Sequence, residues 1–215
     1  MAHVLKPLAR AAAGLLAAAA LLAAAALLAA TAACDGGPGA GRPAFKAVDI
    51  TGAEYARELS LTDVDGVPRT LADFRGKVVL VFFGYTQCPD VCPVTMTELA
   101  EVKRSLGADG SRVVGVFVTV DPERDTAALL KAYMANFGPD MVGLRGTPEQ
   151  VQAAARQFKV FFAKVPGKTA DSYTVDHTAG SYIFDTQGRI RLFTRYGSGA
   201  KALADDLKIL LAEKR

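Results

Sequence analysis

Two continuous apolar runs are the features that most restrict what this chain can fold into. Lys77–Gly84 (KVVLVFFG) and Arg112–Val120 (RVVGVFVTV) are short and rich in β-branched and aromatic residues. Such runs are typical of strands that are buried on both faces of a sheet. They predict a sheet whose two faces are covered by other elements.

The segments around these runs carry helical and hairpin patterns. We expect helices over residues 93–106, 125–137 and 198–213, and a further helix opened by Thr147-Pro148-Glu149-Gln150. Asp125 and Thr147 are the expected N-caps. Residues 180–185 and 189–195 predict two strands joined by the turn Thr186-Gln187-Gly188. The order predicts an α/β fold with a central mixed β-sheet flanked by helices, without internal repeats.

The first 33 residues differ in composition from everything after them. Lys6 and Arg10 precede an uncharged Ala/Leu run, which is the pattern of a secretory signal and is long enough to span a bilayer. Cys34 follows this run directly and resembles the lipidated cysteine of bacterial lipoproteins, although Thr31 stands where that pattern prefers an aliphatic residue. Lipidation of Cys34, an uncleaved membrane helix and simple secretion are the three alternatives. All three place the domain on the far side of a bacterial inner membrane, and the two anchored forms hold it at the periplasmic face.

The remainder of the chain predicts a tether and one domain. Residues 34–44 are rich in Gly and Pro, which indicates a flexible tether, and a single domain follows over residues 45–215. Removal of the first 33 residues takes away two cations and no acids, so the formal charge falls from +3 to +1. A near-neutral domain without a basic stripe gives no electrostatic reason to expect a nucleic-acid partner.

Cys88 and Cys92 lie where the first apolar run ends and a helix begins, which is where open α/β sheets form sites. Pro93 fits the first helical position better than an interior one, so we expect Cys92 at the N-cap. The helix dipole there favours a thiolate, which is both a nucleophile and a soft metal ligand. The alternative is a structural disulfide or two buried free thiols, but closing so short a loop gains little entropy.

His177 is the one histidine left outside the predicted anchor, because His3 lies within it. A loop histidine by itself is more often a solvated bystander than a ligand. Together with two thiolates, however, an imidazole completes a ligand set that suits copper and zinc alike.

Three segments occur in the order FFGYTQCPDVCP, VTVDPERDT and VDHTAGSYIFD. With them the chain, from about residue 55 to its end, resembles the Sco/SenC copper chaperones of cytochrome oxidase assembly. The resemblance implies a thioredoxin-like fold and copper, as Cu(I) and Cu(II), held by Cys88, Cys92 and His177. It also implies that the domain supplies copper to, or reduces the cysteines of, the CuA centre in cytochrome c oxidase subunit II.

Further residues belong to the expected surroundings of this site. Asp121 follows the second apolar run and either orients a ligand from outside the site or merely shapes a turn with Pro122. Met96 is expected in the core. Phe83 and Tyr85 are expected to wall the site.

Three functions from different classes compete. The first is a copper chaperone without catalytic turnover, exchanging copper with subunit II or with other periplasmic copper carriers. The second is a membrane-anchored thiol–disulfide oxidoreductase with Cys88 and Cys92 as its redox disulfide. The third is a peroxidase, which is disfavoured because Tyr85 and Val81 stand where peroxiredoxins place Thr or Ser and Pro. The missing proline before the Gly180 strand favours metal binding over general dithiol exchange.

Overall fold

The structure is a computed structural model that describes residues 44–169 and 172–213. The predicted anchor over residues 1–33, the lipidation site Cys34 and tether residues 35–43 lie outside the described residues. From Phe45 onward the described chain belongs to one unit, which is described here by itself. Within this part of the chain, no helix has the length and apolar character needed to cross a membrane.

A mixed sheet of eight strands, in the order β1-β10-β9-β4-β5-β6-β2-β3, forms the centre of the domain. Its parallel part comprises β4 (Val78–Gly84), β5 (Val113–Thr119) and β6 (Met141–Arg145). The antiparallel strands are β1 (Val48–Asp49), β2 (Ser60–Asp63), β3 (Pro68–Thr70), β9 (Gly180–Phe184) and β10 (Ile190–Arg195). Every residue of β4 and β5 is buried, which confirms the expectation from the two apolar runs.

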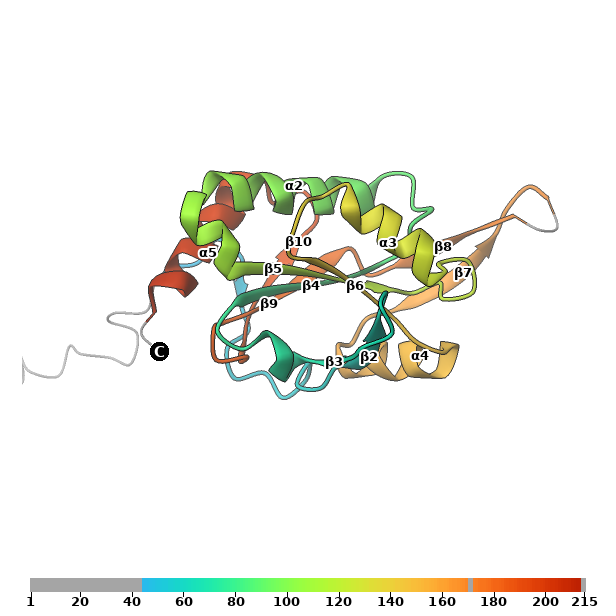
Figure 1. The fold of residues 1–215 in the computed structure, drawn as a ribbon, viewed down its shortest axis with the longest axis horizontal. Coiled ribbons are helices and arrows are strands. Elements are labelled where there is room, and N and C mark those ends of the chain that lie inside the picture. Colours follow the sequence, from blue (N-terminus) through green and yellow to red (C-terminus); the bar gives the residue numbers. More distant parts are fainter. Residues whose placement is uncertain (1–43, 170–171, 214–215) are drawn as a thin grey trace, which may run out of the picture. The chain divides into compact units, whose positions relative to one another are not determined.

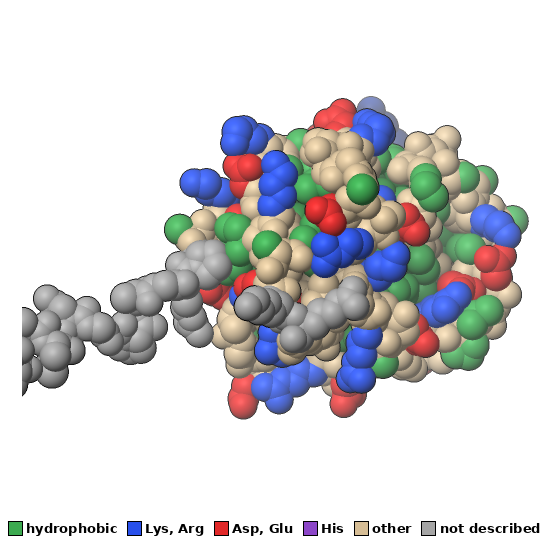
Figure 2. Space-filling view, turned by 60° about the vertical axis from the view of Figure 1, so that its left-hand side comes forward, with side chains coloured by type: hydrophobic (Ala, Val, Ile, Leu, Met, Phe, Trp, Pro, Cys, Tyr) green, Lys and Arg blue, Asp and Glu red, His purple; other side chains and the backbone are tan. Residues whose placement is uncertain are grey.

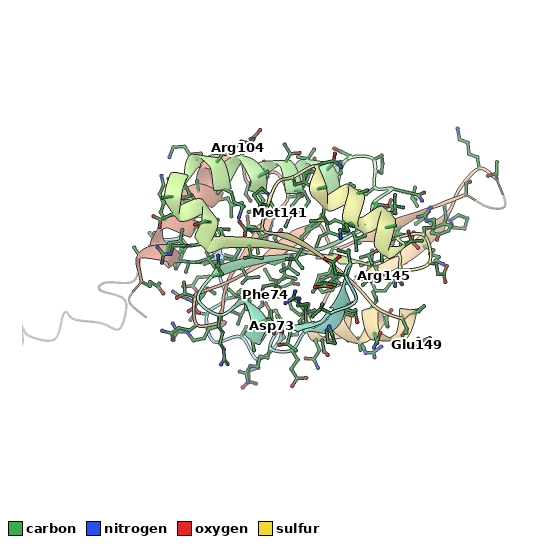
Figure 3. The ribbon with its side chains drawn as sticks, in the orientation of Figure 1. Asp73, Phe74, Arg104, Met141, Arg145 and Glu149 are labelled. Atoms are coloured by element: carbon green, nitrogen blue, oxygen red, sulfur yellow. The ribbon has the colours of Figure 1, made fainter. Side chains whose placement is uncertain are left out.

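Helices cover both faces of this sheet (Figure 1). One face carries α2 (Val91–Ser105), α3 (Ala127–Ala135) and α5 (Ala200–Ala212), and the other carries α4 (Pro148–Gln157) and a 3₁₀ turn at Leu71–Phe74. Met141 lies on the side of α2 and α3, whereas Phe74 lies on the opposite side (Figure 3). The helices turn apolar residues three or four apart toward the sheet, for example Met96 and Leu99 of α2, both fully buried. The mixed sheet flanked by helices is thus confirmed.

Local turn chemistry agrees with the sequence at two places and differs at a third. Thr147 and Gln150 form the expected capping box at the start of α4. Gly188, with φ of +78°, makes the turn between β9 and β10. Asp125 is not the N-cap of α3: Thr126 caps that helix by accepting from the N–H of Leu129 at 3.2 Å. The carboxylate of Asp125 is turned into the protein instead.

A separate two-stranded hairpin, formed by β7 (Phe162–Pro166) and β8 (Tyr173–His177), projects beyond α3 (Figure 1). This hairpin was not expected from the sequence, because most of its residues are half-buried or exposed and form no apolar run. His177 is the last residue of β8 and pairs with Phe162 across the hairpin. The residue expected in a loop is therefore held by strand pairing.

Charged side chains of both signs are mixed over the surface. On the face shown in Figure 2, Lys and Arg side chains lie among Asp and Glu side chains. Several form local pairs, such as Lys201 with Asp205 at 2.8 Å and Arg112 with Asp109 at 2.8 Å. Exposed pairs of this kind add little stability, so the buried sheet and helix faces hold the fold.

Candidate metal centre

Cys88 and Cys92 lie at the junction between the end of β4 and the start of α2. Helix α2 begins at Val91 with Asp90 at its N-cap, so Cys92 is the second helical residue and not the N-cap that we expected. Pro93 is the third helical residue. Its missing N–H costs nothing there, because the first four N–H groups of a helix have no intrahelical partner. The helix therefore starts two residues earlier than the proline suggested.

The two cysteines are free and differ in exposure. Cys88 is half-buried, whereas Cys92 is fully buried. The Sγ of Cys88 accepts a hydrogen bond from the N–H of Cys92 at 3.4 Å. Burial, followed by the hydrogen bond with Cys88, raises the pKa of the Cys92 thiol. The expectation of a thiolate at Cys92 is thus wrong, because desolvation outweighs the helix dipole.

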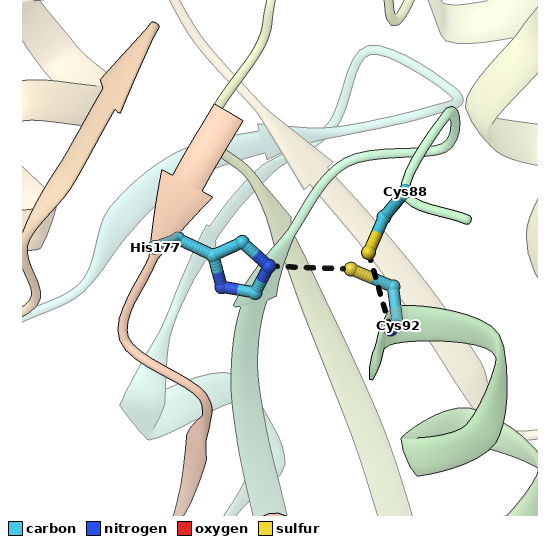
Figure 4. Close-up of side chains that lie close together, drawn as sticks. All are labelled: Cys88, Cys92 and His177. Carbon is cyan, nitrogen blue, oxygen red and sulfur yellow. Dashed lines mark hydrogen bonds between the residues drawn. The ribbon is translucent and has the colours of Figure 1, made fainter. Parts of the chain in front are cut away.

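His177 faces this thiol from the end of β8 (Figure 4). Its Nε2 lies 3.5 Å from Cys92 Sγ, and its Nδ1 lies 3.2 Å from the carbonyl oxygen of Thr178. A carbonyl oxygen only accepts, so Nδ1 carries the proton and the lone pair of Nε2 points at Cys92. Burial lowers the pKa of His177, which favours this neutral tautomer.

The structure thus brings together the three predicted ligands, Cys88, Cys92 and His177. Their two sulfur atoms and one ring nitrogen all lie within 4.8 Å of one another. Ligand atoms bound at about 2.0–2.3 Å to one ion are roughly 3.5–4.5 Å apart. Small side-chain movements are enough to close this group around a metal ion.

Aromatic rings and one glycine surround the ligands. The rings of Phe82 and Tyr85 meet that of His177 edge-on, with centroids 5.7 and 6.1 Å away. Phe83 was expected in this place, but it points to the other face of the sheet and packs on Phe158 with centroids 5.1 Å apart, as strand alternation requires. Met96 is buried in the core, as expected.

Gly84 is a residue of this site that we did not single out from the sequence. A Cβ at this position would lie 2.7 Å from Cys92 Sγ and 2.8 Å from Phe82 Cε1. Only glycine leaves room for the Cys92 sulfur at the end of β4. The signal available in the sequence was a glycine that closes an otherwise bulky apolar strand.

Asp121 is fully buried, and in the described part of the chain its carboxylate makes no hydrogen bond to the three predicted ligands. Its carboxylate accepts from Tyr173 Oη at 2.9 Å and pairs with Arg124. The Arg124 guanidinium lies over the ring of Tyr85 at 5.7 Å from the centroid, and Tyr85 contacts His177. A role of Asp121 in orienting the site stays a prediction, with Arg124 and Tyr85 as its route.

Comparison with known proteins identifies the relatives of this chain. The SCO1/SenC family model matches residues 48–212. The SCO2 homologue from mouse mitochondria is 43% identical over 141 residues, covering 65% of this chain and 54% of the mouse protein. A SCO2-like protein from Rickettsia felis is 33% identical over 152 residues, covering 70% of this chain and 74% of its own length. The chain thus spans about half the length of the mouse relative.

Solved structures agree with this assignment. The copper-bound structure of ScoI from Bradyrhizobium japonicum superposes with a TM-score of 0.65 at 42% identity, over 72% of this chain and 98% of that protein. This similarity and the helix-flanked mixed sheet confirm the expected thioredoxin-like fold. Because the family model covers most of the chain and carries the cysteine pair and the histidine within its range, this protein belongs to the SCO1/SenC family.

Proposed function

We propose that this protein is a copper-binding metallochaperone of cytochrome c oxidase assembly, with Cys88, Cys92 and His177 as the copper ligands. The observation that carries the proposal is the convergence of two thiols and one imidazole within 4.8 Å at the end of a buried strand. Cys92 and His177 are 85 residues apart in the chain, and both cysteines are free in the part of the chain that the structure describes.

The chemistry of the site suits a metal that is held and then released. Copper binds thiolates, so the thiols of Cys88 and Cys92 give up their protons as copper enters. His177 already presents the unprotonated Nε2 toward the site. Cys88 and His177 are only half-buried, which leaves one side open through which an incoming ligand of a partner can exchange with them. The protein supplies binding and access, not turnover of a substrate.

The donor atoms alone would also suit zinc. Copper is favoured because relatives of this chain bind it. The Bradyrhizobium japonicum relative, at 42% identity, was solved with copper bound. The same holds for the ScoI protein of Arabidopsis thaliana at 33% identity. We therefore assign copper, as Cu(I) and Cu(II), as the cargo of this site.

We further propose the CuA domain of cytochrome c oxidase subunit II as the recipient, with other periplasmic copper carriers as donors. The segment 1–33 directs the domain over residues 45–215 to the periplasmic face of the bacterial inner membrane, where an N-terminal anchor holds it. Lipidation of Cys34 is the proposed form of that anchor, and residues 34–44 act as the tether. The composition of these segments supports this placement, and mass spectrometry of the membrane-extracted protein tests it.

Copper titration of the reduced domain tests the site itself. The wild-type protein is expected to bind one copper ion with a thiolate-to-copper absorption band for Cu(II). Cys88→Ser and Cys92→Ser are expected to abolish tight binding, and His177→Ala to weaken it and shift the band. Stoichiometric copper in either serine variant refutes the site. Transfer of copper from the loaded domain to an apo CuA domain then tests the chaperone role.

A thiol–disulfide oxidoreductase is the second candidate. It is favoured by the pairing of a half-exposed thiol, Cys88, with a buried one, Cys92, since the outer sulfur can attack a partner disulfide and the inner one can resolve the mixed disulfide. Reduction of the CuA-domain disulfide by copper-free protein, without copper transfer by the loaded protein, would favour this function over the first.

A further inference from the structure

A buried carboxylate ties the cysteine loop to the neighbouring strand. Asp125 is fully buried, and its Oδ1 accepts from Thr86 Oγ1 at 2.6 Å. Its Oδ2 accepts from the N–H of Thr86 at 3.1 Å and from Thr119 Oγ1 at 2.6 Å. Thr86 stands two residues before Cys88, and Thr119 is the last residue of β5. One side chain thus links the ends of the two central parallel strands.

The three residues before Cys88 are all held by the segment that follows β5. Tyr85 packs against the Arg124 guanidinium, and Gln87 Oε1 accepts from Arg124 Nη1 at 3.2 Å. Between them, Thr86 is held by Asp125 through both its backbone and its hydroxyl group. The bond from Thr86 Oγ1 to Asp125 is the shortest of these contacts, at 2.6 Å, and hydrogen bonds to charged groups are the stronger kind.

The segment that carries Asp125 is itself fixed. The N–H of Asp125 donates to the carbonyl of Asp121 at 2.9 Å. Arg145, at the end of β6 (Figure 3), donates to the carbonyl oxygens of Asp125 and Pro122, each at 3.3 Å. A carboxylate on such a backbone has little freedom, so Thr86 is held against a rigid support.

We propose that Asp125 is a positioning residue of the metal site, which through Thr86 fixes where the Cys88 sulfur stands relative to Cys92 and His177. The inference deepens the proposed function and rests on it for the identity of the metal. The physical effect is pre-organisation: ligands that are already held in place lose little conformational freedom when they bind an ion.

Variants of Thr86 and Asp125 distinguish an effect on the position of Cys88 from a general loss of stability. Thr86→Val removes the hydroxyl donor with almost no change of shape, whereas Thr86→Ser keeps it. Asp125→Asn removes the charge at the other end of the same bond. Asp206→Asn is the matched control, because Asp206 is also buried and accepts from two backbone N–H groups, those of Lys46 and Ala47, both at 2.8 Å.

Two measurements are made on each variant. The first is the equilibrium between the Cys88–Cys92 disulfide and the dithiol in glutathione buffers, in copper-free protein. There two glutathione thiols supply two electrons and two protons and leave as glutathione disulfide. The second is the affinity for copper and the position of the Cu(II)–thiolate band. Thermal unfolding of the same samples gives the stability.

We expect Thr86→Val and Asp125→Asn to lower the equilibrium constant for formation of the Cys88–Cys92 disulfide by up to about tenfold, which is the full effect of one hydrogen bond to a charged group. The same variants are expected to bind copper more weakly with a shifted band, whereas Thr86→Ser and Asp206→Asn behave as wild type. If Thr86→Val keeps the wild-type equilibrium and band, the proposal is overturned, even where Asp125→Asn fails to fold. A wild-type domain that binds no copper overturns the proposed function. The role of Asp125 is still tested in that case, because the glutathione equilibrium is measured in copper-free protein.

Discussion

Replacing Gly84 by alanine is the sharpest test of how tightly the proposed copper site is built into the sheet. The new Cβ would lie 2.7 Å from Cys92 Sγ, 2.8 Å from Phe82 Cε1 and 3.0 Å from Phe117 Cε2. Ordinary contacts of a Cβ begin near 3.4 Å, so the sulfur must retreat by about 0.7 Å or β4 must shift. Overpacking of this kind costs about 1–3 kcal/mol of stability.

The displaced atom is the sulfur of a proposed ligand, so the loss should not be limited to stability. A shift above about 0.5 Å exceeds the tolerance of a pre-organised site, and perturbing the support of a metal ligand costs about 10–100-fold in affinity. We expect Gly84→Ala to weaken copper binding by that factor and to alter the Cu(II)–thiolate band. Urea unfolding and competitive copper titration measure the two effects separately.

Gly143→Ala provides the matched control. Gly143 lies in β6, and its new Cβ would meet Leu130 Cγ at 2.8 Å and Met134 Cγ at 3.1 Å. The crowding is similar, but no ligand of the site is touched. This variant should lose about 1–3 kcal/mol of stability and keep its copper affinity. Equal copper affinity in the two variants, at equal stability loss, would refute the reasoning.

Three further variants and conditions have defined outcomes. Tyr133→Phe should leave stability unchanged or raise it by about 1 kcal/mol in thermal unfolding, because the Tyr133 hydroxyl is buried without a hydrogen-bond partner. A loss of stability in this variant would contradict the reasoning, because it would mean that the hydroxyl has a partner. His177 has its pKa lowered from the ordinary 6.5 by burial, so below about pH 6.5 the unfolded state binds a proton that the folded state resists. Stability measured in urea should therefore be fully present above that pH and fall as the pH drops, less so in His177→Ala. Asp206→Ala should lower the free energy of unfolding by about 2–3 kcal/mol, because the N–H groups of Lys46 and Ala47 lose a charged acceptor. Its copper affinity should stay at the wild-type value.

Much of the framework could be predicted from local sequence. The apolar runs of β4 and β5 are continuous because both faces of these strands are buried, and burial on both faces leaves a direct mark on composition. The capping box at Thr147 and the turn at Gly188 are local hydrogen-bond and backbone requirements. The SCO1/SenC motifs placed Cys88, Cys92 and His177 in one site, and the structure brings their ligand atoms together.

The tertiary structure alone decided the chemical state and the surroundings of that site. Whether Phe82 or Phe83 faces His177 depends on which side of β4 turns toward the hairpin β7–β8. That hairpin could not be predicted, because its half-exposed strands have no hydrophobic pattern in the sequence. Asp125 was expected to cap α3, yet hydrogen bonds from Thr86, 39 residues away in the chain, and from Thr119 turn it inward. The helix position of Cys92 favoured a thiolate, but packing buries this thiol completely and raises its pKa. A helix dipole is a local property that a sequence can indicate, whereas desolvation is the sum of everything packed around a group, and only the folded chain determines that sum.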